Sequence, residues 1–197
     1  MQVDEQRIAT IVEQVMRQLK DNASNVVADS GQDGIFTDVD VAVKAAWQAQ
    51  KELVALSLAQ RKKIIDAIRE AGIANAEYFA RKTVEESGLG RYEHKIQKNI
   101  NAARLSPGIE DLAPKVQSGD HGITITKTAP YGLIVSITPT THPTPFVINH
   151  AIIMLAGGNT VFFCPHPRAQ RCSREAIQIL NRAIVGAGGP RNCLVAV

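Results

Sequence analysis

Two short segments carry the side chains best suited to holding a ligand. They read Thr138-Pro-Thr-Thr-His-Pro-Thr144 and Cys164-Pro-His-Pro167. Each follows an apolar run typical of a buried strand, and prolines restrict the backbone of both. Hydroxyl and imidazole groups on a stiffened loop can hold a ribose or a pyrophosphate in a fixed place. Prolines are also common in ordinary strand-to-helix loops, so the spacing alone leaves both interpretations open.

Glycine-rich phosphate-binding motifs are missing. The run Gly186-Ala-Gly-Gly-Pro-Arg191 has an arginine where a dinucleotide fingerprint needs its third glycine, and it follows a predicted helix instead of opening one. Gly88-Leu-Gly90 fails in the same way, and no P-loop is present. The sequence therefore predicts that any cofactor site is of another kind.

Histidines and cysteines do not indicate a metal site. Histidines at positions 142, 150 and 166 lie in one region, but no HxxxH motif or paired carboxylate accompanies them. The cysteines are Cys164, Cys172 and Cys193, which form no CxxC pair. We therefore predict no metal and three packed or incidental free thiols in a reducing compartment.

Composition describes an ordinary soluble globular protein. Of the 197 residues, 45% are hydrophobic and 21% charged, and the net charge is +3. Basic residues are interspersed with acids, which argues against nucleic acid as a partner. No apolar run approaches the roughly 20 residues that span a bilayer, and the first residues are not those of a secretion signal. We predict no membrane partner and a cytoplasmic location.

The second half of the sequence alternates between strand and helix patterns. Residues 123–128 are predicted as a strand with one wet face, and residues 133–137, apolar on both faces, as a central strand. A helix over 146–155, a strand over 160–163, a helix over 168–187 and a strand over 193–197 follow. This β-α-β-α-β order predicts an α/β fold with a parallel, nucleotide-binding sheet. Both candidate loops would then lie beyond the carboxyl ends of strands, where such sheets bind ligands.

Residues 36–106 are predicted to form helices that pack and tether. Thr37 or Asp38 can cap the first helix, and Ser57 with Gln60 has the form of a capping box for a second that ends near Gly72. Two more are predicted, over residues 75–87 and over a segment that ends before Pro107. No chemistry is predicted here.

Residues 1–20 have the pattern of an amphipathic helix, and residues 21–35 that of a flexible linker, which leaves 36–197 as the main domain. The apolar stripe includes Ile8, Val12 and Leu19. It can pack on its own domain, form a coiled coil, or dock into another protein's groove.

The two loops and their flanks resemble the aldehyde dehydrogenase superfamily. Ala129-Pro-Tyr-Gly-Leu-Ile-Val-Ser-Ile-Thr-Pro-Thr-Thr-His-Pro-Thr144 resembles its signature loop. The segment from Asn149 to Pro167, with Glu85-Glu-Ser-Gly-Leu-Gly-Arg91, Lys98-Asn99 and Ala187-Gly-Gly-Pro190, is similar to the CoA-acylating branch of bacterial microcompartments, including the ethanolamine-utilisation acetaldehyde dehydrogenases. The likeness spans almost the whole chain.

The resemblance implies NAD as cofactor, with CoA and a short aldehyde as substrates. It places Thr138, Pro139, Thr140 and Thr141 along the nicotinamide end of NAD, and Cys164, Pro165 and His166 near the adenosine ribose. It also implies a homo-oligomer, and it makes residues 1–20 a peptide that docks cargo on a microcompartment shell. That location is the expected one within the cytoplasm.

His142 departs from the family pattern. The family has an asparagine here whose amide helps to form the oxyanion hole, and loss of one such donor costs on the order of 2.7–4 kcal/mol. A neutral imidazole has one N–H, so we expect an impaired oxyanion position at His142.

The family's nucleophilic cysteine has no counterpart among the three cysteines here. In the family that thiolate attacks the aldehyde, hydride passes to NAD, and CoA releases the acyl group. Three interpretations follow: an enzyme by family of which this chain is the inactive amino-terminal part, a non-catalytic protein that docks to a shell or partner, or a gene remnant.

Overall fold

The computed structural model describes residue 31 and residues 33–197. The predicted docking helix (1–20) and most of the linker (21–35) lie outside the described residues. The helices are α2 (Val39–Ala55), α3 (Leu58–Ala74), α4 (Ala76–Ser87), α5 (Tyr92–Leu105), α6 (Pro143–Ala156) and α7 (Gln170–Gly186), with short 3-10 turns η1 (Ile109–Leu112) and η2 (Pro167–Ala169). The strands are β1 (Lys115–Gly119), β2 (Gly122–Thr126), β3 (Leu133–Thr138), β4 (Thr160–Pro165) and β5 (Leu194–Val195).

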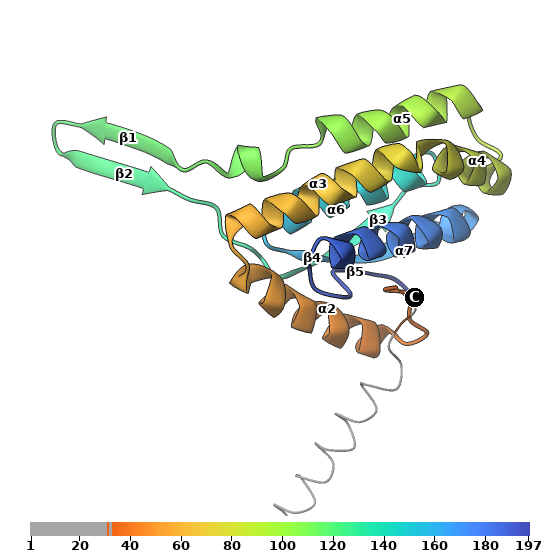
Figure 1. The fold of residues 1–197 in the computed structure, drawn as a ribbon, viewed down its shortest axis with the longest axis horizontal. Helices are drawn as coiled ribbons and strands as arrows, with labels where there is room; N and C mark the ends of the chain where they lie inside the picture. The colour runs from red at the N-terminus through yellow and green to blue at the C-terminus, as the bar shows by residue number, and fades with distance from the viewer. Residues whose placement is uncertain (1–30, 32) are drawn as a thin grey trace, which may run out of the picture. The chain divides into compact units, whose positions relative to one another are not determined.

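A parallel sheet in the order β3-β4-β5 forms the centre of the fold (Figure 1). Helix α6 connects β3 to β4, and η2 with α7 connects β4 to β5. The predicted α/β fold with a β-α-β-α-β order is confirmed. Each neighbouring pair of strands is parallel, so their carboxyl ends meet at one edge of the sheet.

Helices cover both faces of the sheet. Alternate residues of β4 point to opposite faces. Val161 and Phe163 join a large apolar core with α3, α6 and α7, whereas Phe162 joins a smaller one with α2. Figure 1 shows α2 on one side of the strands and α3, α6 and α7 on the other. The full burial of residues 160–163 confirms their prediction as a buried strand.

Strand β3 is not the central strand that its apolar sequence predicted. In the described sheet it lies at an edge, and the central position belongs to β4. Val135 is 62% exposed and Ile137 80% exposed. Leu133, on the same face, packs with the α2 core, but no element in the described part of the chain covers the two residues that follow it on that face. A strand that is apolar on both faces is expected to have other elements packed against both. In the described part of the chain, the face of β3 that carries Val135 and Ile137 lacks such an element at these two residues.

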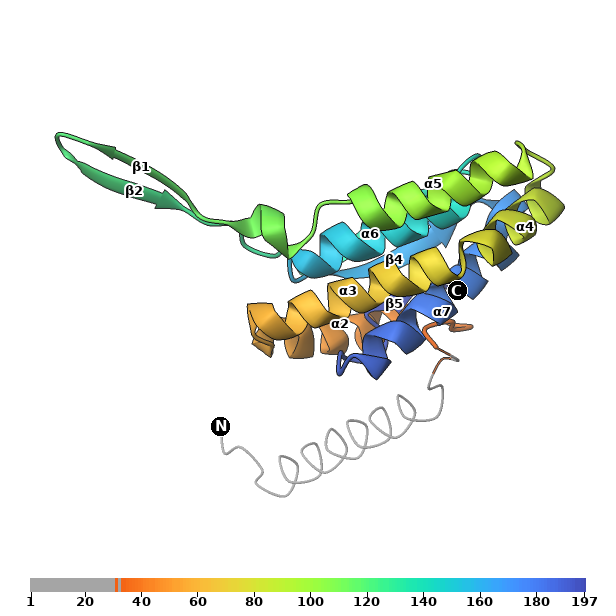
Figure 2. The same ribbon diagram turned by 45° about the horizontal axis from the view of Figure 1, so that its top comes forward.

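The strand predicted over residues 123–128 forms, but without a buried face. It appears as β2, paired antiparallel with β1, and all ten residues of this hairpin are exposed. Ile123 and Ile125 are 70% and 62% exposed. Figures 1 and 2 both show the hairpin extending away from the helices, so no described element packs against its apolar side.

The predicted helices of residues 36–106 are present. Asp38 caps α2 by accepting a hydrogen bond from the amide of Val41 at 2.9 Å. Ser57 caps α3 by accepting from the amide of Gln60 at 3.1 Å. The Gln60 side chain does not return to Ser57 but donates to the carbonyl of Ala187 at 2.7 Å, so only half of the capping box forms.

Helix α3 ends at Ala74, two residues beyond Gly72 and thus near the predicted end. Gly72 is buried where α3 lies close to α5 and α6. A Cβ at this position would be 3.2 Å from the Cβ of Ala103 and 3.4 Å from Ile148. The glycine therefore serves close helix packing, and the chain turns only at Asn75. Helix α4 ends as predicted, at Gly88 with φ +67°.

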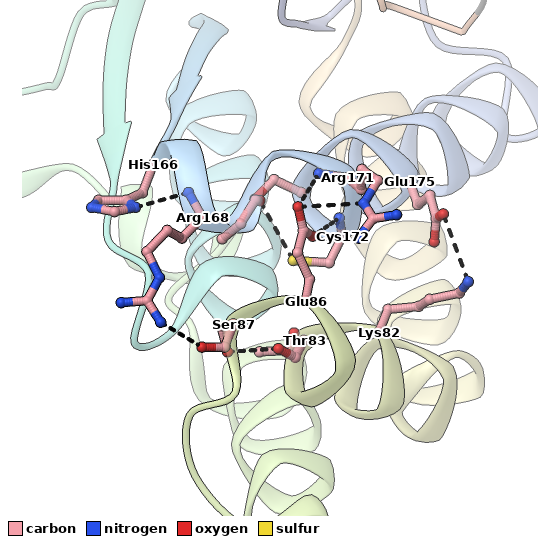
Figure 3. Close-up of polar contacts among 11 residues, drawn as sticks. Lys82, Thr83, Glu86, Ser87, His166, Arg168, Arg171, Cys172 and Glu175 are labelled. Carbon is pink, nitrogen blue, oxygen red and sulfur yellow. Dashed lines mark hydrogen bonds and ion pairs between the residues drawn. The ribbon is translucent and has the colours of Figure 1, made fainter.

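A carboxylate from α4 caps the start of α7 (Figure 3). Glu86 accepts hydrogen bonds from the backbone amides of Arg171 at 2.9 Å and Cys172 at 2.7 Å. Burial raises the pKa of Glu86, but the two amides, the Cys172 side chain and the charge of Arg171 together outweigh it and hold the pKa below its ordinary value. Nearby, Arg168 donates to the carbonyl of Ser87 at 3.1 Å. These contacts attach the β4-to-α7 connection to the end of α4.

No helix among the described residues combines the length and the apolar composition needed to cross a bilayer.

Removing the Glu86 cap should destabilise the domain. In Glu86→Ala the amide of the exposed Arg171 and the amide of the buried Cys172 lose their acceptor, at an expected cost of about 1–3 kcal/mol in the free energy of unfolding. The pKa of Glu86 is lowered in the folded state, so its contribution is present above the unfolded glutamate pKa and is lost as the pH falls through the folded pKa. Urea unfolding at several pH values measures both effects. Glu85→Ala, which removes the exposed neighbouring carboxylate, is the control; equal losses in the two variants would contradict the capping role.

Candidate functional site

The register of β3 and β4 brings the two predicted loops together. Thr138, the last residue of β3, pairs with Pro165, and Ile137 pairs with Cys164. Thr138 thus ends a strand, and Cys164 and Pro165 belong to β4 instead of the loop in which they were predicted. The loops proper begin at Pro139 and at His166. Both leave the same edge of the sheet.

Two threonine hydroxyls at this edge are buried without a hydrogen-bond partner among the described residues. They are Oγ1 of Thr138 and Oγ1 of Thr140. A buried hydroxyl that makes no hydrogen bond costs about 1–3 kcal/mol, so such groups are rare in native structures. Their presence on neighbouring loop positions suits a site in which a ligand supplies the missing partner.

The second loop is fixed by its own histidine. Nδ1 of His166 accepts a hydrogen bond from the amide of Arg168 at 3.1 Å and caps η2. The proton of a neutral His166 is therefore on Nε2. Cys164 is half-buried beside it.

His142 occupies the N-cap position of α6, and both of its ring nitrogens are engaged. Nε2 lies 2.8 Å from Nζ of Lys98, and Nδ1 lies 2.9 Å from the hydroxyl oxygen of Thr141. An ammonium group can only donate, so Nε2 accepts and the single N–H of the neutral ring is on Nδ1. Burial, and then the charges of Lys98 and Lys95, lower the pKa of His142, which favours this neutral form.

This tautomer leaves no free N–H on the imidazole. The Nδ1–H is directed to Thr141, and Nε2 carries a lone pair. An oxyanion beside Nε2 would meet a lone pair, and the N–H groups next to it belong to Lys98.

Helix α5 contributes a set of basic residues that the sequence analysis did not assign to any site. A cavity of about 220 Å³ is lined by Leu89, Gly90, Arg91, His94, Lys95, Lys98, Thr141 and His142. Four of these lining residues are basic side chains of the segment 36–106, for which no chemistry was predicted. Their spacing of three and four residues, which places them on one helix face, was the signal that could have identified them.

Buried polar contacts hold the turn before α6 against α5. Lys95, only 4% exposed, donates to the carbonyl of Thr141. The fully buried Asn99 accepts from the hydroxyl of Thr144 at 2.8 Å and donates to the carbonyl of Ala76 at 3.1 Å. The position of His142 is thus set from α4 and α5 as well as from the sheet.

A second cavity, of about 330 Å³, shares Lys98 and His142 with the first as lining residues. Its further lining residues are Asn101, Ala102, Pro145, Phe146 and Asn149. It is more apolar than the first cavity and contains one aromatic ring. A small molecule with a short hydrocarbon part fits such a lining.

Two of the three cysteines are unsuited to nucleophilic chemistry. Burial raises the pKa of Cys172 to about 12, and it raises the pKa of Cys193 to about 12. A thiol with such a pKa is almost entirely protonated at neutral pH and is a poor nucleophile. Both behave as the packed thiols that were predicted.

The known proteins that are similar to this chain are named as aldehyde dehydrogenases. The sequence model described as "Aldehyde dehydrogenase family" matches residues 13–196. An acetylating acetaldehyde dehydrogenase of Bilophila wadsworthia is 47% identical over 100% of the chain and 42% of its own length. An acetylating acetaldehyde dehydrogenase of Salmonella typhimurium is 44% identical over 99% of the chain and 41% of its own length. The chain thus spans about two fifths of the length of these curated relatives.

Solved structures give the same result. A propionaldehyde dehydrogenase of Rhodopseudomonas palustris with bound propionyl-CoA has a TM-score of 0.81 and 42% identity, over 87% of this chain and 38% of that one. A propionaldehyde dehydrogenase of the Clostridium phytofermentans fucose utilisation microcompartment has a TM-score of 0.80 and 46% identity, over 83% and 38%. The predicted resemblance to CoA-acylating enzymes of microcompartments is confirmed.

Replacing Lys98 should change the titration of His142. In Lys98→Met the cation beside Nε2 is gone, so the pKa of His142 should rise toward the ordinary histidine value, although only in part because burial is the larger cause of its depression. The Nδ1–H tautomer should also become less favoured. Long-range ¹H–¹⁵N correlation spectra across a pH titration report both. Lys63→Met removes an exposed lysine of α3 as control; an unchanged His142 titration in Lys98→Met would contradict the contact.

Proposed function

Because the chain belongs to the aldehyde dehydrogenase family, we propose that it forms the amino-terminal, NAD-binding part of a CoA-acylating aldehyde dehydrogenase that acts on a short aldehyde. The observation that carries the proposal is the pair of unpartnered threonine hydroxyls, Thr138 and Thr140, at the carboxyl edge of a parallel sheet. Ligands of open α/β sheets bind at this edge. When bound, NAD supplies the acceptor for the hydride of the aldehyde.

Each loop has a distinct part in this proposal. Thr138 and Thr140 offer hydroxyls to the cofactor, and Pro139 fixes the backbone between them while Thr141 holds His142. Cys164, Pro165 and His166, which begin beside the first loop, take the ribose at the adenosine end. Arg168 attaches the end of this second loop to α4, and Glu86 attaches the start of α7 that follows it.

The aldehyde is proposed to lie on the side of the second cavity, between Phe146 and His142. A carbonyl oxygen directed at His142 would gain negative charge during attack. Since Nδ1–H is directed to Thr141, the ring gives this oxygen little stabilisation unless it turns or Lys98 takes its place. These residues would thus bind NAD and position the aldehyde. They would provide only a weak oxyanion position, and none of them acts as the nucleophile.

A single hydroxyl deletion tests the cofactor site. In Thr140→Val the buried hydroxyl that would bond to NAD becomes a methyl group of similar size, and loss of that hydrogen bond should weaken NAD binding by about 3- to 10-fold. The stability of the free chain should not fall, because the hydroxyl has no partner to lose. Isothermal titration calorimetry with NAD measures the first effect and thermal unfolding the second.

The matched control is Thr124→Val, which makes the same change on the exposed hairpin. Its NAD affinity should equal that of the unchanged chain. If NAD does not bind at all, or if both variants bind it equally, the cofactor site is not at Thr140.

We also propose that residues 1–20 dock this protein to a microcompartment shell and that the protein self-associates. Support comes from the amphipathic spacing of Ile8, Val12 and Leu19, and from the similar Clostridium phytofermentans enzyme, whose name assigns it to a microcompartment. For self-association, the support is the exposed Ile123 and Ile125 of the hairpin.

Fusion of residues 1–20 to a fluorescent protein should direct it to shells in cells that assemble them. The variant with Ile8, Val12 and Leu19 replaced by serine keeps the length and charge of the segment, and it should give a diffuse signal. Fluorescence microscopy distinguishes the two patterns; diffuse fluorescence from the unchanged segment would rule out shell docking by residues 1–20.

A further inference from the structure

The cavity beneath α5, which we call the basic pocket, has an unusual balance of charge. Its charged lining residues are Arg91, Lys95 and Lys98, joined by the imidazoles of His94 and His142, and no carboxylate lines it. None of the ion pairs formed by the described residues includes any of the three cations. The pocket therefore concentrates positive charge that the described chain does not neutralise.

The helix itself gains nothing from this arrangement. Lys95 and Lys98 are three residues apart on one face of α5, and like charges on neighbouring helix positions destabilise a helix by about 0.2–0.5 kcal/mol per pair. Glu93, the one acid of the first turn, is two residues from Lys95 and therefore lies on another face of α5. A set of cations placed on one face at such a cost is typical of a site whose ligand carries the opposite charge.

Lys95 is positioned in a way that a solvated surface lysine is not. Its side chain is 4% exposed and its ammonium group donates to the Thr141 carbonyl. It passes directly over Gly90, where a Cβ would be 2.7 Å from Cε of the lysine. An ammonium has three N–H groups, and the Thr141 carbonyl is its one hydrogen-bond acceptor among the described residues, so two N–H groups are available to a ligand.

Two helix ends add to the positive potential. Helix α5 begins next to Arg91 and α6 begins next to His142, and neither has a side-chain cap hydrogen bond. Pro143 and Pro145 have no amide N–H, so the start of α6 contributes mainly through the helix dipole. The amino end of a helix carries about half a positive charge and is a frequent site of anions. Here these ends support a site that the three cations already define.

We infer that the basic pocket binds a phosphate group, either free phosphate or the terminal phosphate of a larger ligand. A phosphate is the anion that matches several converging cations best, because it offers two negative charges and can accept a bidentate contact from Arg91 together with bonds from Lys95 and Lys98. The volume of about 220 Å³ accommodates a group of this size and excludes a whole dinucleotide. The inference does not depend on NAD binding at the threonine loops.

Phosphate titration of the whole chain, followed by ¹H–¹⁵N correlation spectra at constant ionic strength, tests the inference. Inorganic phosphate should cause saturable shifts at Gly90, Lys95, Lys98 and Thr141, and acetate at the same concentrations should bind at least about tenfold more weakly, since a monoanion forgoes a charge-assisted bond. Glycerol 3-phosphate in place of phosphate distinguishes the sources. Tighter binding of the ester indicates a phosphate carried on a larger ligand, and tighter binding of inorganic phosphate indicates the free ion.

Substitutions within the pocket complete the test. Arg91→Met changes an exposed side chain and should weaken phosphate binding roughly tenfold. Lys95→Met should weaken it further, provided that the variant keeps the dispersed spectrum of a folded chain. Lys63→Met, on α3, should have no effect. The inference is overturned by the absence of saturable shifts, by equal binding of acetate and phosphate, or by equal phosphate affinity in Arg91→Met and Lys63→Met.

Discussion

Helix α6 buries one long face, which includes Val147, Ile148, Ala151, Ile152 and Leu155, whereas Phe146 is 37% exposed, so the helix must lie with that face against the sheet and the neighbouring helices. Its core residues, including Ile148 and Ile152, lie in the same apolar core as α3, α7 and the inner face of β4. This burial determines where α6 begins. Its amino end must emerge at the carboxyl edge of β3, and His142, Thr141 and the threonine loop are placed there as a consequence. The packing of α6 therefore determines the position of this part of the candidate site.

The replacement of an amide by an imidazole at His142 has an effect that depends on the neighbours more than on the residue itself. Lys98 forces Nε2 to act as an acceptor, and Thr141 takes the remaining N–H. A histidine without a lysine beside it could present either nitrogen. The electrostatics of α5 therefore control the donor capacity of a residue on α6, and the basic pocket and the proposed oxyanion position share Lys98 as a common member.

Local patterns in the sequence predicted the elements of this fold well and their surroundings less well. Caps such as Asp38 and Ser57 act within a few residues, so they could be recognised without tertiary information. The exposure of Val135 and Ile123 depends on what covers them, which no local pattern contains. Gly72 was predicted to mark the end of a helix, whereas it serves close packing against Ala103 and Ile148. These two residues come from distant parts of the chain, so no local pattern could reveal that role.

The candidate site, like the fold, was predictable where local sequence determines it and unpredictable where tertiary packing does. Strand ends and proline-rich loops placed Thr138 and Cys164 at one edge, because parallel strands require it. The family resemblance supplied the significance of His142. Neither could indicate that Lys95 is buried under Thr141, since a lysine on a helix is usually solvated and only the packing of α5 against α6 shows otherwise. The burial of Lys95 is thus the part of this site that depends on tertiary packing and not on local sequence.

The pairing of Ile35 with Ala196 has a consequence for how the protein is made. These residues form a parallel bridge, with the amide of Phe36 donating to Ala196 at 2.9 Å and the amide of Ala196 donating to Gly34 at 3.0 Å. Asn181 adds bonds of 2.7 Å to the carbonyls of Asp33 and Leu194. Contacts that join positions so far apart in the sequence cannot form until the ribosome has synthesised the later one. The segment that precedes α2 can therefore join the sheet only after β5 has been made, so attachment of this first described segment is a late step in the folding of the domain.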